Sequence, residues 1–167
     1  TCLNGLGDVA RQGGELARAQ RLTLRALGIT EELGNHILIA DCYNDLSEIS
    51  RIEGDFARAA DRAERAAELY ESVGSDQSLR ARRNLGFIAL CQRDFESAWS
   101  TFEVLRERLG RTHEYSELSM VLAGRMPCLA ARGRWGELAR ALERATHLLA
   151  QTERCDADIQ FACRLAA

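Results

Sequence analysis

The chain has 167 residues, of which 46% are hydrophobic and 28% are charged, with 13 glycines, a single proline and a formal net charge of −3. The high apolar content and small net charge exclude an intrinsically disordered chain, and the sequence has no run of about 18 apolar residues that could span a membrane. The 22 basic and 25 acidic residues nearly balance, so no net field attracts nucleic acid or anionic lipid. We therefore expect a globular domain that binds neither nucleic acid nor membranes.

The cysteine and histidine spacings give no metal-binding motif. The six cysteines stand at positions 2, 42, 91, 128, 155 and 163. No C-x-x-C pair exists, and the three histidines are not spaced to complete a zinc site. We expect no metal and no cofactor. We expect buried free thiols in a reducing cytoplasm, with disulfides as the alternative that an even count leaves open.

Composition and chain ends indicate the kind of parent protein. Every basic residue is arginine, and alanine is the commonest residue, a composition associated with GC-rich bacterial genomes. The first residues show no basic stretch followed by an apolar run, so no signal peptide is predicted. The chain has no initiating methionine and stops inside a helical pattern, and we interpret it as a fragment of a longer protein.

Hydrophobic spacing is helical along the chain, and no strand pattern competes with it. After Asp55, for example, apolar residues recur at i, i+3, i+4 and i+7. Gly34, Gly74 and Gly110 are expected to end three helices with a positive φ. Asp55 and Asp94 stand where a helix start takes a capping carboxylate. In chain order the sequence predicts helices at about 1–12, 15–33, 36–52, 55–73, 76–92, 94–109, 113–131, 134–151 and 156–166.

A repeat of about 40 residues organises these helices. Its turn positions lie 40, 39 and 40 residues apart, at Gly14, Gly54, Arg93 and Gly133. Two residues after each turn stands a large apolar residue: Leu16, Phe56, Phe95 and Trp135. Twelve residues after each turn stands alanine or leucine: Ala26, Ala66, Leu105 and Ala145. Agreement at this many positions over four copies predicts a repeat architecture.

Small residues at matching positions explain how such helices would pack. Upstream of the first three turns stand Gly7, Ser47 and Gly86, and downstream stand Ala19, Ala59 and Ala98. Small side chains on both helices of a pair allow close approach, and the large residue after the turn is expected to fill the space between them. One pair cannot bury its apolar face alone, so neighbouring pairs must stack.

With these residues in place, the chain resembles the tetratricopeptide repeat (TPR) family. The period is longer than the usual 34 residues, and glycine replaces the usual closing proline. Such lengthened repeats are similar to those of bacterial signalling and regulator scaffolds. The resemblance implies an all-α, right-handed α-solenoid of about four helix pairs plus a C-terminal helix, in a single domain over 1–167. The expected repeats are 1–34, 35–74, 75–112 and 113–152, and the terminal helix is 156–166.

Pro127 interrupts the first helix of the fourth pair, where it is expected to kink the helix. Two interpretations remain open. The bend is either tolerated in a degenerate repeat or it reshapes a binding groove.

In the family, the first helices of the pairs line a concave groove that does the binding. The match places these groove residues in the first three repeats: Asn4, Asp8, Arg11, Asp41, Asn44, Asp45, Glu48, Arg51, Arg80, Arg83, Asn84, Phe87 and Cys91. The fourth repeat would add Met120, Ala123, Gly124, Pro127 and Ala131. A peptide with a basic stretch beside an acidic end would be complementary to such a groove. The alternative is that the charges are solvated or paired with one another.

Two more specific hypotheses, a carboxylate clamp and catalysis, are disfavoured. A clamp for a C-terminal carboxylate would use Arg80, but Asp45 would repel that carboxylate. Carboxylates, histidines and cysteines show no catalytic spacing, and no glycine-rich phosphate loop is present.

The leading hypothesis is therefore a non-enzymatic scaffold that binds a protein or peptide segment along the groove. The alternative is an autoregulatory or oligomerisation segment of a large bacterial signalling protein or transcriptional regulator. Such a segment could form a homo-oligomer through the exposed ends of the solenoid.

Overall fold

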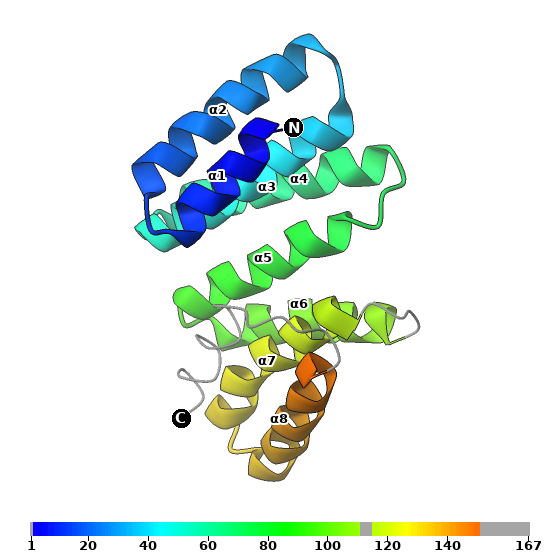
Figure 1. Cartoon of the computed structure of the whole chain (residues 1–167). Coiled ribbons are helices and arrows are strands. Elements are labelled where there is room, and N and C mark those ends of the chain that lie inside the picture. The colour runs from blue at the N-terminus through cyan, green and yellow to red at the C-terminus, as the bar shows by residue number, and fades with distance from the viewer. Residues whose placement is uncertain (1, 111–114, 151–167) are drawn as a thin grey trace. The chain divides into compact units, whose positions relative to one another are not determined.

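The computed structural model describes residues 2–110 and 115–150, and these form helices joined by short turns, with no strand among them (Figure 1). The helices are α1 (Cys2–Gln12), α2 (Leu16–Glu32), α3 (His36–Glu53), α4 (Phe56–Ser72), α5 (Ser78–Cys91), α6 (Phe95–Leu109), α7 (Tyr115–Ala131) and α8 (Trp135–Ala150). The all-α prediction is confirmed, and each of these helices begins and ends close to its predicted bounds. The predicted helix at 156–166 lies outside the described residues.

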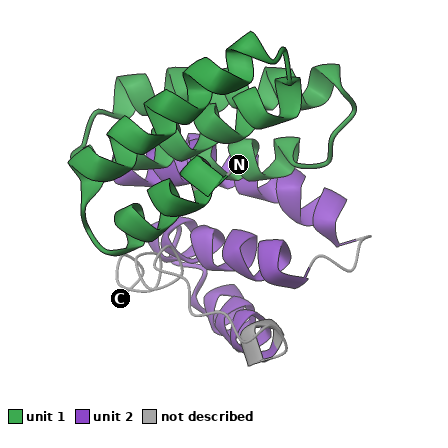
Figure 2. Cartoon of the chain, turned by 45° about the horizontal axis from the view of Figure 1, so that its top comes forward, with its two compact units in different colours: residues 1–84 green, residues 85–167 purple. Residues whose placement is uncertain are grey.

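The chain forms two compact units, Thr1–Asn84 and Leu85–Ala167, whose boundary falls within α5 (Figure 2). In the first unit α1 packs on α2, α2 on α3 and α3 on α4. In the second unit α6 packs on α7 and α7 on α8. Consecutive helices therefore pack as pairs within each unit.

The four repeat turns share one backbone conformation. Gly14, Gly54 and Gly133 have φ values of 78°, 84° and 65°, and Arg93 has 61°. Arg93 is the one non-glycine residue with positive φ among the described residues. Since glycine adopts this left-handed region without steric cost, the turns explain why three of the four positions are glycine.

Helix caps were predicted with one error. Asp55 and Asp94 do cap α4 and α6, because their carboxylates accept backbone hydrogen bonds from residues 58 and 97 at 3.1 and 3.0 Å. Gly34 and Gly74 have the expected positive φ. Gly110 does not: its φ is −64°, and its N–H donates to the carbonyl of Arg106 at 2.9 Å. The chain thus leaves α6 in a right-handed conformation, so the prediction for Gly110 was wrong.

Small residues hold the helix pairs of the first unit together. Ala19 and Ala59 are buried, and the Ser47 hydroxyl donates to the Ala59 carbonyl at 2.7 Å. A Cβ added at Gly7 would lie 2.9 Å from Thr23 Oγ1, closer than side chains tolerate. The predicted close approach of paired helices is confirmed here.

In the second unit, one buried aromatic ring fills the space between three helices. The Phe102 ring of α6 would meet a Cβ added at Gly86 of α5 at 2.7 Å and one at Gly124 of α7 at 2.5 Å. Phe87 packs against the same ring edge-to-face, with centroids 5.3 Å apart. Phe102 therefore occupies the place that the sequence analysis gave to the large residue after the turn. Trp135, one of those residues, is 63% exposed, which corrects the prediction.

The described cysteines form no disulfide with one another. Cys42 and Cys128 are buried thiols, Cys91 is half-buried and Cys2 is exposed. Burial raises the pKa of the Cys128 thiol to about 11. Burial of the thiols is thus confirmed for two positions, while positions 155 and 163 lie outside the described residues.

None of the described helices combines the length and the apolar character needed to cross a membrane. Pro127 lies within α7, where it is buried.

Candidate interaction surface

The first helices α1 and α3, together with the part of α5 that belongs to the first unit, carry a connected set of charges. Arg11 of α1 contacts Glu48 of α3 at 2.9 Å and Asp8 of its own helix at 3.1 Å. Arg80 of α5 lies 4.0 Å from Asp45 of α3. We call Asp8, Arg11, Asp45, Glu48 and Arg80 the charged network.

Helical spacing explains why these side chains meet. Positions 41, 45 and 48 are separated by four and three residues, so they share one face of α3. Positions 8 and 11 share a face of α1 in the same way. The network therefore follows directly from stacking first helices with their polar faces on the same side.

A pair of asparagines links α3 and α5 beneath these charges. The Asn84 amide donates to Asn44 Oδ1 at 2.9 Å and to Glu48 Oε1 at 3.3 Å. Both asparagines are fully buried. This contact was not predicted, although the sequence carries a signal for it: asparagine recurs at positions 4, 44 and 84, at the period of the repeat.

The two buried carboxyl groups of the network have opposite pKa shifts. Burial alone would raise the pKa of Glu48, but Arg11, Arg83, Arg80 and Arg51 outweigh it and lower the pKa. Burial raises the pKa of Asp45 to about 8, helped by the negative charges of Asp8 and Glu48 and opposed by Arg80 and Arg11. Glu48 is therefore ionised at neutral pH, whereas Asp45 is largely protonated there.

Asp41 lies on the same face of α3 but is bonded differently. It accepts a hydrogen bond from the Tyr70 hydroxyl of α4. Burial, together with this bond, raises the pKa of Tyr70, so the phenol remains a donor. Asp41 is half-buried and is held in place by a partner in its own repeat.

Exposure divides the predicted groove residues into two groups. The side chains of Asp8, Arg80 and Arg11 are 43%, 39% and 22% exposed and reach the surface. Glu48 is almost completely enclosed, and Arg83 is buried as well. The solvated interpretation is therefore wrong for these two, whereas mutual pairing is found between Arg11 and Glu48.

Several predicted groove residues are corrected by their burial. Phe87 is fully buried against Phe102, because it belongs to the core of the second unit, and it cannot line a groove. Asn44 and Asn84 are enclosed and support the surface from below. The fourth-repeat residues Met120, Ala123, Gly124 and Pro127 are likewise buried, and only Ala131 of that set is exposed. Asn4 lies on α1, and its side chain is outside the described part of the chain.

No cluster of three or more histidine, cysteine, aspartate or glutamate side chains suited to a metal occurs among residues 2–110 and 115–150. The network instead offers fixed charges of both signs on one helical face. Such a face can recognise a polar segment of another protein.

The paired helices, the shared turns and the face of first-helix side chains define an all-α helical-repeat protein. Residues 1–72 match the family model described as tetratricopeptide repeat. Residues 1–72 therefore carry the tetratricopeptide-repeat pattern that the sequence predicted. Repeats of this family generally serve as protein–protein interaction scaffolds.

Solved structures agree on the fold. The chain is similar to BtubC (BKLC) from P. vanneervenii, with a TM-score of 0.74 and 20% identity, over 92% of this chain and 64% of that one. A candidate kinesin light chain from Podosopora anserina with nearly identical TPR-like repeats gives 0.63 and 13% identity, over 92% and 76%. A form of that protein with methionine in place of one glutamine gives 0.70 and 13%, over 99% and 82%. The chain thus spans less than two thirds of the length of BtubC.

No curated protein matches the sequence significantly. The structural similarity, at these identities, establishes the TPR-like α-solenoid fold class.

Proposed function

We propose that this chain is a non-enzymatic scaffold that binds a protein or peptide segment on the first-helix face of the first unit. One observation carries the proposal: charges of both signs, Asp8 and Arg11 of α1 and Arg80 of α5, lie beside the buried carboxyl groups of α3 yet remain partly exposed. Asp8, Arg11 and Arg80 are half-buried, and so is Asp41, which lies on the same face outside the network.

The order of the charges suggests the chemistry of the partner. Asp8 and Asp41 would attract basic side chains, and Arg80 would attract an acidic side chain or a terminal carboxylate. A segment with basic residues beside an acidic one is therefore complementary. Because Arg11 already contacts the carboxylates of Asp8 and Glu48, its side chain has little entropy left to lose on binding.

Selection from a random peptide library displayed on phage, with the whole chain as bait, tests the proposal. We expect the selected peptides to combine basic and acidic residues. Their affinity, measured by calorimetry, is expected to fall about tenfold in Arg80→Glu, because an attraction becomes a repulsion.

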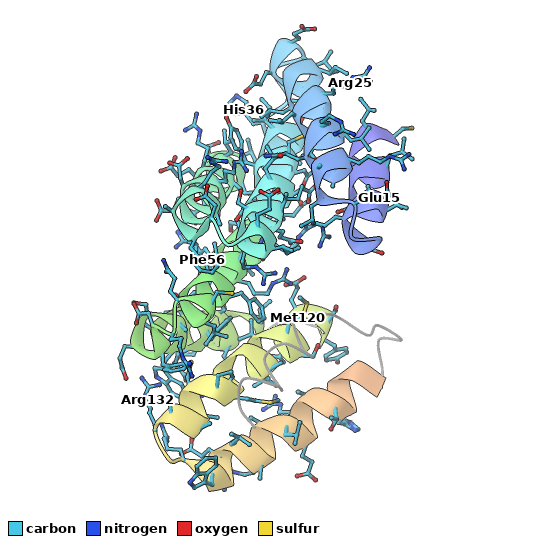
Figure 3. All side chains as sticks on the ribbon, turned by 90° about the vertical axis from the view of Figure 1, so that its left-hand side faces the viewer. Glu15, Arg25, His36, Phe56, Met120 and Arg132 are labelled. Atoms are coloured by element: carbon cyan, nitrogen blue, oxygen red, sulfur yellow. The ribbon has the colours of Figure 1, made fainter. Side chains whose placement is uncertain are left out.

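Arg25→Glu is the matched control for this substitution. Arg25 is exposed on α2, away from the first-helix face, and its side chain is labelled in Figure 3. We expect this control to change the affinity less than about twofold. Equal losses in the two variants, or selected peptides without charged residues, would reject the proposed surface.

A second candidate function is assembly through the first helix pair. Leu6 and Val9 of α1 are large apolar residues that are 53% and 68% exposed. If this face associates with another copy, light scattering should give a mass above that of one chain, and Val9→Glu should reduce it. A monomer at all concentrations would exclude this alternative.

We place the scaffold in a bacterial signalling or regulatory protein of the cytoplasm. The supports are the arginine- and alanine-rich composition and the burial of the Cys42 and Cys128 thiols outside any disulfide among the described residues. Because that compartment is reducing, we expect the free energy of unfolding to stay the same when a reductant is added.

A further inference from the structure

The second unit contains an open pocket of about 480 Å³ between α6, α7 and α8. Its wall combines one tryptophan with arginines from all three helices: Trp99, Arg106, Arg125, Arg134, Arg140 and Arg144. Glu103 and Glu137 complete the charged part of the wall. Five arginines thus face two glutamates, which leaves an excess of positive charge in a concave site.

Trp99 organises several of these cations. The guanidinium carbons of Arg125 and Arg132 lie 4.6 Å from the centroid of its ring, and that of Arg134 lies at 5.4 Å. Cations at such distances are attracted to the electron-rich face of indole. Figure 3 labels Arg132, which follows α7 in the turn to α8. The tryptophan therefore holds guanidinium groups from neighbouring segments close together.

Two glutamates hold three of these arginines in place by ion pairs. Glu103 of α6 contacts Arg125 of α7 at 2.7 Å and also contacts Arg106 on its own helix. Burial would raise the pKa of Glu103, but its bonds to these arginines lower it, so it stays ionised. Glu137 of α8 contacts Arg134 in the same manner. These three arginines are held in position before any ligand arrives.

Arg140 and Arg144 differ from the other arginines of the wall. Both are exposed on α8, one turn apart. Neither has a carboxylate partner within ion-pair distance in the part of the chain that the structure describes. Two such cations, beside cations that are already positioned, give the described part of the pocket wall its excess of positive charge.

We propose that this pocket is a second binding site, which takes an oxyanion-bearing peptide segment, one with carboxylate or phosphate side chains. Guanidinium groups present paired N–H donors that match the two oxygens of a carboxylate or phosphate. Arg140 and Arg144 make the first ionic contacts, and the arginines around Trp99 line the interior. The site is independent of the first-helix face, since all of its residues belong to the second unit.

A peptide fits this site better than a nucleic acid does. A nucleic-acid surface usually extends as a basic stripe over a net basic domain, whereas this chain has a net charge of −3. The glutamates at the wall would also repel a continuous phosphate backbone. A short segment with one or two anionic side chains can place them between the glutamates.

The test uses the whole chain and three fluorescein-labelled peptides of identical length. One carries a run of glutamates, the second carries phosphoserines at the same positions, and the third carries glutamines. We expect the glutamate peptide, the phosphoserine peptide or both to bind, and the glutamine peptide not to bind. Whichever anionic peptide binds more tightly identifies the carboxylate or the phosphate as the preferred group.

Arginine substitutions locate the binding. Arg140→Ala and Arg144→Ala are each expected to weaken binding about fivefold to tenfold, because each removes a charge-assisted contact. Arg108→Ala is the matched control: Arg108 is exposed on α6 but does not line the pocket. It is expected to change affinity less than about twofold.

Trp99 supplies an independent readout. The chain has two tryptophans, and Trp135→Phe leaves Trp99 as the only one, since Trp135 is exposed and outside the pocket wall. Peptide binding is expected to change the fluorescence of this variant. Folding of every variant is checked by its circular dichroism.

Three results would overturn the proposal. The first is equal binding of the glutamine peptide. The second is an equal loss of affinity in Arg108→Ala, which would mean nonspecific attraction. The third is tighter binding of a short single-stranded DNA that is lost in the same variants. None of these results depends on Arg80 or on the peptides selected for the first unit.

Discussion

The two units use arginine and aromatic residues in opposite ways. In the first unit, arginines contact buried carboxylates on adjacent first helices, as in the Arg11–Glu48 pair, and the helix pairs meet through alanine, serine and threonine. In the second unit, a phenylalanine ring fills the interior, and arginines gather around Trp99 in an open pocket. The comparison shows that one repeat pattern supports two different ways of packing helices.

This difference has a consequence for function. In the first unit, most of the charged side chains contact one another, so only the partly exposed ones, Asp8, Arg11 and Arg80, can contact a partner. In the second unit, Arg140 and Arg144 of α8 line the pocket and are exposed there. Substitutions at equivalent positions of the two units can test how far this contrast extends.

The largest expected effect concerns the interior. Phe102 and Thr23 each stand nine residues after a repeat turn, so they are equivalent positions of two repeats. Phe102→Ala would leave a cavity between α5, α6 and α7 and should lower the free energy of unfolding by about 4 kcal/mol. Thr23→Ala removes a hydroxyl that donates to the Ala19 carbonyl at 3.0 Å and should lower it by about 1 kcal/mol. Urea unfolding measures both.

Gly124→Ala completes this test from the other side of the ring. The added Cβ would press on Phe102, and we expect a loss of roughly 1–3 kcal/mol. Combining Gly124→Ala with Phe102→Leu should cost less than the sum of the two separate changes, because the smaller side chain leaves room. Strict additivity would mean that the ring does not hold these helices together.

The second effect concerns the proton on Asp45. The folded protein retains this proton up to about pH 8, whereas the unfolded chain releases it near pH 3.9. Between these values the unfolded state binds fewer protons, so this group lowers stability as the pH rises. Asp45→Asn should therefore raise the free energy of unfolding by several kcal/mol at about pH 8, and by much less at about pH 4.5.

The exposed Asp61 of α4 provides the control for this pH dependence. Asp61→Asn should change the free energy of unfolding by less than about 0.5 kcal/mol at either pH. Denaturant curves at the two pH values, for both variants, give the comparison. A gain for Asp45→Asn that is the same at both pH values would contradict the buried, protonated carboxyl.

The smallest effect concerns the turn between α5 and α6. Arg93 adopts the left-handed conformation that glycine adopts at the other three turns. Arg93→Gly should remove this strain and raise the free energy of unfolding by roughly 0.5–1 kcal/mol, after the greater freedom of glycine in the unfolded chain is subtracted. The reverse change, Gly54→Ala, should lower it by about 1 kcal/mol. Thermal unfolding that ranks the two variants the other way would contradict the equivalence of the turns.

Local features of this protein could be predicted from sequence, because they repeat. Turns and helix caps depend on the backbone conformation of a few neighbouring residues, so a short segment of sequence is enough to predict them. Examples are the turns at Gly14, Gly54 and Gly133 and the caps at Asp55 and Asp94. The prediction was wrong for Gly110, because its N–H continues the helical hydrogen bonding to the Arg106 carbonyl and its φ stays negative.

Contacts between distant side chains were harder to predict. The Asn44–Asn84 hydrogen bond has a signal in the sequence, because the two asparagines are separated by the period of the repeat. Phe87 was assigned to the groove by its position in the repeat. In the structure it packs in the core against the Phe102 ring, which fits between two glycines. The pocket at Trp99 had no periodic signal, because it combines side chains that only one repeat carries.

A charge-reversal rescue tests most directly whether partner segments bind through the charges of the first-helix face. Arg80→Glu is measured against a selected peptide and against the same peptide with its acidic residue changed to lysine. If Arg80 meets that residue, the lysine peptide should bind Arg80→Glu within about threefold of the original affinity. If the lysine peptide binds Arg80→Glu no better than the original peptide does, the first-helix face is not the binding surface.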